Sequence, residues 1–268
     1  MAALPPTEHI LLYLADGWLT IWLNRPQARN ALSAEMMEEL RAVLLTVRED
    51  RTVRGISFRG KGGVFCAGGD IKDFRSVLQG GQPGVEAVAA LSRRAGELFR
   101  MVNEMPQVTV MMVEGAAMAG GLGLACAGDV VAVRRDAEFA LTETMLGIPP
   151  AQIAPLVVQR IGSAAARRIM LTAARFDGDE ALRLGIADFV ADDAEGLEAI
   201  ETGIKAKVRR CAPGANAVTK EILLAAPHLG REAMLDFAAS GFARAILSDE
   251  GREGVAAFLE KRRPRWAE

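Results

Sequence analysis

The order of β-rich runs and helical stretches constrains this chain most strongly. Short β-rich runs alternate with helical stretches through the first 190 residues, and the runs lie at 18–23, 54–58, 108–113, 130–133 and 139–141. This alternation is typical of a largely parallel, layered α/β core. Ser33 precedes apolar residues at helical spacing from Met37 to Val47, so we expect a helix to begin there.

The pattern changes after Val190. Residues 194–225 and 231–260 carry mainly helical signals without obvious strands. We therefore expect a core at 1–193 and a helical oligomerisation region at 194–268. The apolar content of this second region exceeds what a few helices of a monomer normally bury, which favours self-association.

Charge and cysteine content exclude several classes of protein. The 268 residues include 32 Lys and Arg against 34 Asp and Glu, and a formal net charge of −2 gives no field to attract nucleic acid. Cys66, Cys126 and Cys211 are few and far apart, which argues against a disulfide framework or structural zinc and favours the reducing cytoplasm. We find no targeting or spanning segment, so no membrane association is expected.

Two glycine-rich turns are the first candidates for a site. Each of the turns, 65–72 and 119–124, can bring bare backbone N–H groups close to a ligand. Two such groups directed at one carbonyl oxygen would form an oxyanion hole. Taken alone, the glycines favour the simpler interpretation of tight turns that serve helix–strand packing.

Glu143 is the first candidate for acid–base chemistry. It stands in the otherwise apolar run 139–147, where burial should raise the pKa of a carboxyl and suit it to accept and return a proton. The alternative is that Glu143 caps the following turn. The two histidines, His9 and His228, lie outside such turns, which disfavours histidine triads and metal chemistry.

Four segments in order, 23–32, 65–72, 115–129 and 143–148, resemble those of the crotonase, or enoyl-CoA hydratase/isomerase, superfamily. The similarity extends from about Gly17 to 258–262. It implies an α/β fold with a spiral core of ββα units and a C-terminal helical trimerisation region. It also implies an acyl-CoA substrate, a homotrimer or a hexamer of two trimers, no metal, and no cofactor, since CoA is part of the substrate.

The resemblance also implies roles for individual residues. Gly69 and Gly120 match positions whose N–H groups hold the thioester oxygen, and Glu143 matches a catalytic carboxylate. The positions matched to CoA binding are Gln27, Ala28, Arg29, Ala67, Gly68, Asp70, Ile71, Phe258 and Lys261. Many relatives have lysine where this chain has Gln27.

One departure from the family narrows the expected reaction. Well-known hydratases carry a second Glu where this chain has Gly123, and relatives with a single Glu include Δ3,Δ2-enoyl-CoA isomerases and hydratases of branched glutaconyl-CoA. Residues 143–155 and 173–177 are more similar to the second group, the 3-methylglutaconyl-CoA and isohexenylglutaconyl-CoA hydratases of leucine and acyclic-terpene degradation. Lys72 and Arg75 are candidates to bind a distal carboxylate.

We therefore expect a hydratase, with an isomerase as the alternative. A non-catalytic CoA-binding or RNA-binding scaffold on the same fold is a third interpretation. It is disfavoured by the presence of Glu143 and by the near-neutral net charge.

Overall fold

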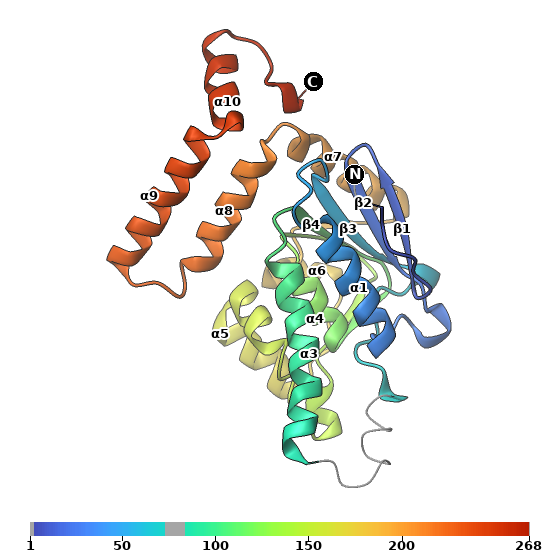
Figure 1. The fold of residues 1–268 in the computed structure, drawn as a ribbon. Helices are drawn as coiled ribbons and strands as arrows, with labels where there is room; N and C mark the ends of the chain where they lie inside the picture. Colours follow the sequence, from blue (N-terminus) through green and yellow to red (C-terminus); the bar gives the residue numbers. More distant parts are fainter. Residues whose placement is uncertain (1–2, 73–83, 268) are drawn as a thin grey trace.

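The computed structural model describes residues 3–72 and 84–267. Its centre is a six-stranded sheet in the order β1-β2-β3-β4-β6-β8 (Figure 1). These strands are β1 (Ile10–Ala15), β2 (Trp18–Leu23), β3 (Gly55–Gly60), β4 (Val108–Val113), β6 (Val130–Arg134) and β8 (Phe189–Ala191). Strands β1 and β2 pair antiparallel and the other neighbours pair parallel.

Helices cover both faces of this sheet. The main core lies on one face, under α1 (Ala34–Val47), α3 (Val85–Asn103), α4 (Gly120–Cys126), α5 (Ala154–Thr172) and α6 (Gly178–Leu184). Because side chains alternate along a strand, Met111 of β4 joins this core while Val110 and Met112 face the other side. There they pack with Leu197 and Ile204 of α7 (Ala194–Arg209).

Helix α7 is also tied to the sheet by buried charge. The carboxylate of Glu201 accepts hydrogen bonds from Arg59 at 3.3 Å and from Ser57 at 2.5 Å. Helix α7 thus packs on the core, although it lies beyond the boundary expected at residue 193. The helices that project away are α8 (Pro213–Ala225), α9 (Arg231–Leu247) and α10 (Asp249–Leu259), which we call the helical arm (Figure 1).

Most of the expected elements are present. The strands at 18–23 and 108–113 are confirmed, and Ser33 caps α1 by accepting a hydrogen bond from the Met36 amide at 3.3 Å. The expected strand at 139–141 is β7 (Glu138–Ala140). Three strands were not expected, β1 and the short strands β5 (Ala116–Met118) and β8. No helix within the described ranges combines the length and apolarity needed to cross a membrane.

Candidate active site

A small parallel ladder forms the frame of the candidate site. Strands β5 and β7 pair in parallel, with Ala117 opposite Phe139. Cys66 pairs with the other side of Ala117, also in parallel, through hydrogen bonds of 3.0 Å to the Ala116 carbonyl and 2.9 Å from the Met118 amide. Three segments distant in the sequence therefore run side by side in one direction.

Each segment leads at its carboxyl end to one of the predicted catalytic residues. Gly69 follows the paired residue of the first segment by three positions, and Gly120 follows that of β5 by three. Glu143 follows the paired residue of β7 by four. The carboxyl ends of parallel strands meet at one edge of a sheet, where α/β proteins commonly place their ligands. The ladder therefore directs these three residues to the same edge.

The two glycine-rich turns are in direct contact. A Cβ added to Gly68 would lie 2.9 Å from the Ala119 Cβ and 3.3 Å from the Gly120 nitrogen. A Cβ added to Gly120 would lie 3.5 Å from the Gly69 nitrogen. Neither the Gly69 amide nor the Gly120 amide donates a hydrogen bond to any part of the chain that the structure describes. The Gly69 and Gly120 amides thus border one space, which a side chain at position 68 or 120 would fill.

The Gly120 amide is set by an unusual backbone conformation. Ala119, just before α4, has φ 50° and ψ −122°, a costly conformation for a residue with a Cβ. It is held by a hydrogen bond of 2.8 Å from the Ala119 amide to the carbonyl of Ala140 in β7. The Gly120 amide is then among the first N–H groups of a helix, which have no partner within the helix and favour negative charge.

Glu143 presents a carboxylate oxygen that nothing in the described residues satisfies. It is the first residue of the 3-10 helix η3 (Glu143–Leu146), and its buried Oε2 has no hydrogen-bond partner there. Burial raises the pKa of this carboxyl, although a hydrogen bond to its own backbone opposes the change. A capping role does not explain the free oxygen. A bound molecule with a proton to exchange would explain it.

The position of the missing second carboxylate is filled. A Cβ on Gly123 would lie 2.1 Å from Cγ2 and 2.5 Å from Cβ of Ile153, whose side chain is only 4% exposed. Ile153 precedes α5 and packs over α4 at this point. Helix α4 can therefore carry no side chain at position 123 unless Ile153 moves.

The segments matched to CoA lie beside the first turn. The Ala67 amide donates to the Arg29 carbonyl at 3.0 Å, which joins the two loops. Gln27 and Arg29 are exposed, Ala28 is half-buried, and Ile71 is 71% exposed. Gly68 is buried and holds the turn by donating to the Cys66 Sγ at 3.4 Å.

Asp70, also matched to CoA binding, has both carboxylate oxygens hydrogen-bonded within the protein. One carboxylate oxygen accepts a hydrogen bond from Arg25 at 2.8 Å and the other accepts one from the Lys72 amide at 3.0 Å. Burial alone would raise the pKa of Asp70, but these hydrogen bonds and the Arg25 charge hold it below its usual value. The negative charge of Asp70 is thus neutralised by Arg25 within the protein.

The C-terminal positions lie apart from the ladder. Phe258, 83% exposed, belongs to α10, and Lys261 follows that helix. Figure 1 shows α10 at the end of the molecule opposite to α3 and α5. One chain therefore does not bring these residues to the other site residues. Lys72 is exposed, and Arg75 lies outside the described residues.

Two residues that serve the site, Arg25 and Leu32, were not predicted; they hold the first turn. The contact by which Ile153 fills the space over Gly123 was not predicted either. For Arg25, the only local signal is its place beside a proline directly after a strand, in the segment that resembles the family. The contact between Ile153 and Gly123 has no local signal, because the two residues are thirty positions apart.

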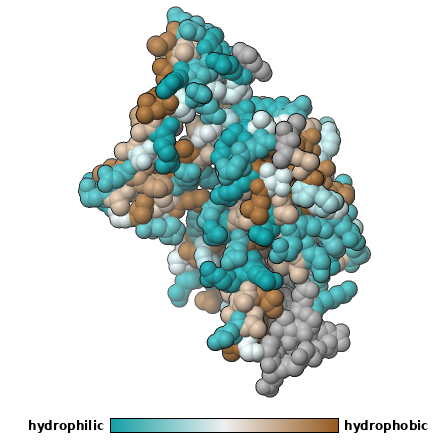
Figure 2. All heavy atoms as spheres, in the orientation of Figure 1, coloured by the Kyte–Doolittle hydropathy of each residue, from teal (hydrophilic) through white to brown (hydrophobic). Residues whose placement is uncertain are grey.

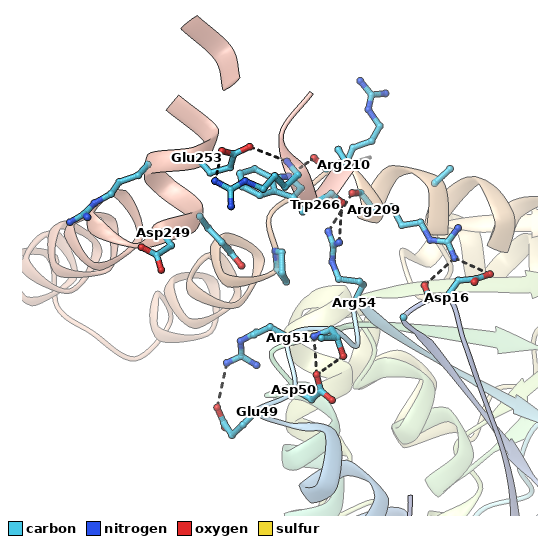
Figure 3. A pocket seen from close by; sticks show the side chains of 18 of the residues that line it. Asp16, Glu49, Asp50, Arg51, Arg54, Arg209, Arg210, Asp249, Glu253 and Trp266 are labelled. Atoms are coloured by element: carbon cyan, nitrogen blue, oxygen red, sulfur yellow. Dashed lines mark hydrogen bonds and ion pairs between the residues drawn. The ribbon is translucent and has the colours of Figure 1, made fainter. Parts of the chain in front are cut away.

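A cleft of about 1440 Å³ lies elsewhere in the part of the chain that the structure describes. Figure 3 shows it between the core and α10, lined by side chains of both signs, among them Arg51, Arg54 and Glu49. Arg54 donates to the main-chain carbonyls of Trp266 and Arg209, which fastens the C-terminal segment to the core. No group of three or more metal-ligating side chains occurs in residues 3–72 and 84–267.

Comparisons with known proteins agree with this geometry. A solved structure of Pseudomonas aeruginosa AtuE is 52% identical, covers 97% of this chain and 100% of its own, and has a TM-score of 0.93. The structure of an enoyl-CoA hydratase/isomerase from Marinobacter aquaeolei is 42% identical, with 97% and 99% covered and a TM-score of 0.93. A carnitinyl-CoA dehydratase of Proteus mirabilis is 32% identical over 92% of this chain and 94% of its own length.

The family model described as enoyl-CoA hydratase/isomerase matches residues 15–268. Together with the solved structures, this confirms the expected α/β crotonase fold with its C-terminal helices. The chain belongs to the enoyl-CoA hydratase/isomerase family.

Proposed function

We propose that this protein is an enoyl-CoA hydratase that adds water across the 2,3 double bond of a CoA thioester. The observation that carries the proposal is that the backbone amides of Gly69 and Gly120 lie at the same edge of the ladder as the carboxylate of Glu143, and that neither amide nor Oε2 of Glu143 has a hydrogen-bond partner among the described residues. Donors without partners stabilise developing negative charge, and a buried carboxylate can exchange protons.

The proposed reaction uses these groups in two steps. In the first, Glu143 accepts a proton from water while the water oxygen bonds to C3, and the π electrons move to give an enolate. The thioester oxygen carries the negative charge and accepts hydrogen bonds from the Gly69 and Gly120 amides. In the second, Glu143 returns the proton to C2. The reaction requires no cofactor beyond the CoA that the substrate carries.

A single carboxylate must serve both steps. The glycine at 123 does not open space for a branched acyl group, because Ile153 occupies that space. Proton transfer in both directions then depends on Glu143, whose raised pKa brings its two protonation states closer in free energy near neutral pH. A single carboxylate that accepts and returns a proton also suits a Δ3,Δ2-enoyl-CoA isomerase, which we keep as the alternative.

We further propose a branched glutaconyl-CoA as substrate, isohexenylglutaconyl-CoA or 3-methylglutaconyl-CoA, in acyclic-terpene or leucine catabolism. Three large apolar side chains follow Glu143 and are open to a ligand: Met145, Leu146 and Ile148 are 73%, 68% and 41% exposed. Such a surface suits an apolar acyl tail. Lys72 and Arg75 remain the candidates to bind a distal carboxylate.

We propose that the two joined loops form the CoA-binding side of the site. They contain Gln27, Ala28, Arg29, Ala67 and Ile71. Phe258 and Lys261 would reach CoA only across a subunit boundary, because α10 lies at the far end of its own chain (Figure 1).

The three free cysteines support a reducing, cytoplasmic location. Fluorescence imaging of a tagged chain tests that location.

The first prediction concerns assembly. Large apolar side chains of the helical arm are exposed, among them Leu235, Phe242, Leu247 and Leu259, and Figure 2 shows apolar surface on the arm. Burying them between chains would remove a patch larger than soluble monomers usually carry. Light scattering of the full-length protein is expected to give the mass of three or six chains. The mass of one chain would refute the proposed trimer.

The second prediction concerns the carboxylate. Glu143→Gln should lower kcat by at least about two powers of ten, with little change in CoA-ester affinity. It should also raise Tm at neutral pH. Folding raises the pKa of Glu143, so the ionised carboxylate destabilises the native state above that pKa, and this loss disappears below about pH 4.5. A Glu143→Gln variant that keeps half of the wild-type rate would show that Glu143 is not the acid–base residue.

The third prediction concerns the oxyanion donors. Gly120→Ala should fold, because its Cβ would meet only ordinary contacts, yet it should lower kcat roughly 10²-fold by filling the space beside the Gly69 amide. Gly203→Ala is the matched control, since a Cβ there in α7 meets no atom within 4 Å. We expect steady-state assays to leave the control near wild type. Equal activity of both variants would rule out the oxyanion role.

The fourth prediction concerns the reaction itself. Absorbance of the enoyl-thioester band should fall as a 2-enoyl-CoA is hydrated, and kcat/KM should be highest for branched glutaconyl-CoA esters in a panel that includes linear chains. Lys72→Met should lower kcat/KM only for esters with a distal carboxylate. Faster isomerisation of a 3-enoyl-CoA than hydration of the matched 2-enoyl-CoA would show instead that the protein is an isomerase.

A further inference from the structure

The backbone on both sides of Gly69 is held by one residue of the neighbouring loop. The Leu32 amide donates to the Gly68 carbonyl at 2.8 Å, and the Asp70 amide donates to the Leu32 carbonyl at 3.1 Å. This isolated parallel bridge uses the groups that flank Gly69. The N–H of Gly69 itself therefore points away from Leu32 and stays free.

The side chains of Arg25 and Asp70 close a ring around this bridge. The Arg25 guanidinium donates to the Ala31 carbonyl at 2.6 Å and to the Asp70 carboxylate at 2.8 Å. Ala31 and Asp70 are the chain neighbours of the two bridged residues. The two charged side chains are only 14% and 9% exposed, so water screens their attraction poorly.

The Arg25 end of the ring is itself fixed. Asn30 is fully buried with φ 54°, and its side-chain oxygen accepts a hydrogen bond from the Arg25 amide at 2.8 Å. Its side-chain nitrogen donates to the carbonyls of Lys61 and Val64 at 2.8 and 2.6 Å. Arg25 is therefore anchored to a rigid loop, and it transmits that rigidity to the turn that carries Gly69.

We propose that Arg25 and Asp70 are positioning residues whose ion pair fixes the direction of the Gly69 amide toward the thioester oxygen. The inference rests on the proposed role of that amide as an oxyanion donor. An amide that tilts away from the oxyanion loses transition-state stabilisation even when the substrate still binds. The pair should therefore govern kcat more than KM.

Two conservative variants test the proposal. Arg25→Lys keeps the charge but cannot bridge a carbonyl and a carboxylate with a planar fork, and Asp70→Asn keeps the shape but removes the charge. We expect each to lower kcat by about 10-fold or more while KM changes less than about threefold. Thermal unfolding of each variant, followed by circular dichroism, reports whether the fold survives.

Arg160 supplies a matched control. Its guanidinium also bridges a carboxylate and main-chain carbonyls, Asp188 at 2.6 Å and Ile186 and Gly128 at 2.6 and 3.0 Å. Its side chain is 13% exposed, close to the 14% of Arg25, and it lies outside the candidate site. Arg160→Lys should lower Tm by an amount comparable to Arg25→Lys and leave kcat near wild type.

A spectroscopic reading separates positioning from general damage. A saturated acyl-CoA labelled with ¹³C at the thioester carbonyl binds without turnover, and hydrogen bonds from the two amides lower its infrared stretching frequency. We expect the full lowering in wild type and Arg160→Lys, and a smaller one in Arg25→Lys and Asp70→Asn. These bound spectra do not depend on the rate of catalysis.

The possible outcomes are distinct. If wild type itself shows no lowering, the oxyanion role of the amides is wrong and the positioning inference falls with it. If wild type shows the lowering and both site variants retain it in full, only the positioning inference is overturned. A loss of kcat in Arg160→Lys equal to that in Arg25→Lys would also overturn it, because the effect would then come from stability alone.

Discussion

The three-segment parallel ladder is the constraint on which the site depends. Without the pairing of Cys66 with Ala117 and of Ala117 with Phe139, nothing local would bring together turns separated by about fifty residues in the sequence. Parallel pairing matters because it places all three carboxyl ends at one edge. The two free amides and the carboxylate then follow from chain direction, and few side chains are needed to arrange them.

Features of the candidate site lower the stability of the fold, and contacts elsewhere must offset this loss. Ala119 holds a disfavoured backbone conformation, and the buried Oε2 of Glu143 has no hydrogen-bond partner in the part of the chain that the structure describes. The compensation lies in the surrounding frame. The pair of Arg25 and Asp70 binds the first turn. On the opposite face of the sheet, α7 packs on β4 and is hydrogen-bonded to β3 through Glu201.

Local signals predicted the fold well where they were strong. The cap at Ser33 and the β-rich run at 18–23 correspond to observed elements because capping and β-branching act over a few residues. The glycines and Glu143 were found as well, and the resemblance supplied their roles. The strand at 116–118 was missed because three residues carry no periodicity, and the contact of Ile153 with α4 is visible only in three dimensions.

A crystal structure with a 2-enoyl-CoA held in the Glu143→Gln variant tests the central claim most directly. We expect the thioester oxygen to lie about 2.7–3.1 Å from both the Gly69 and the Gly120 nitrogens, with the residue at 143 beside the double bond. A thioester oxygen bound by other groups, with these two amides facing solvent, would contradict the proposed mechanism.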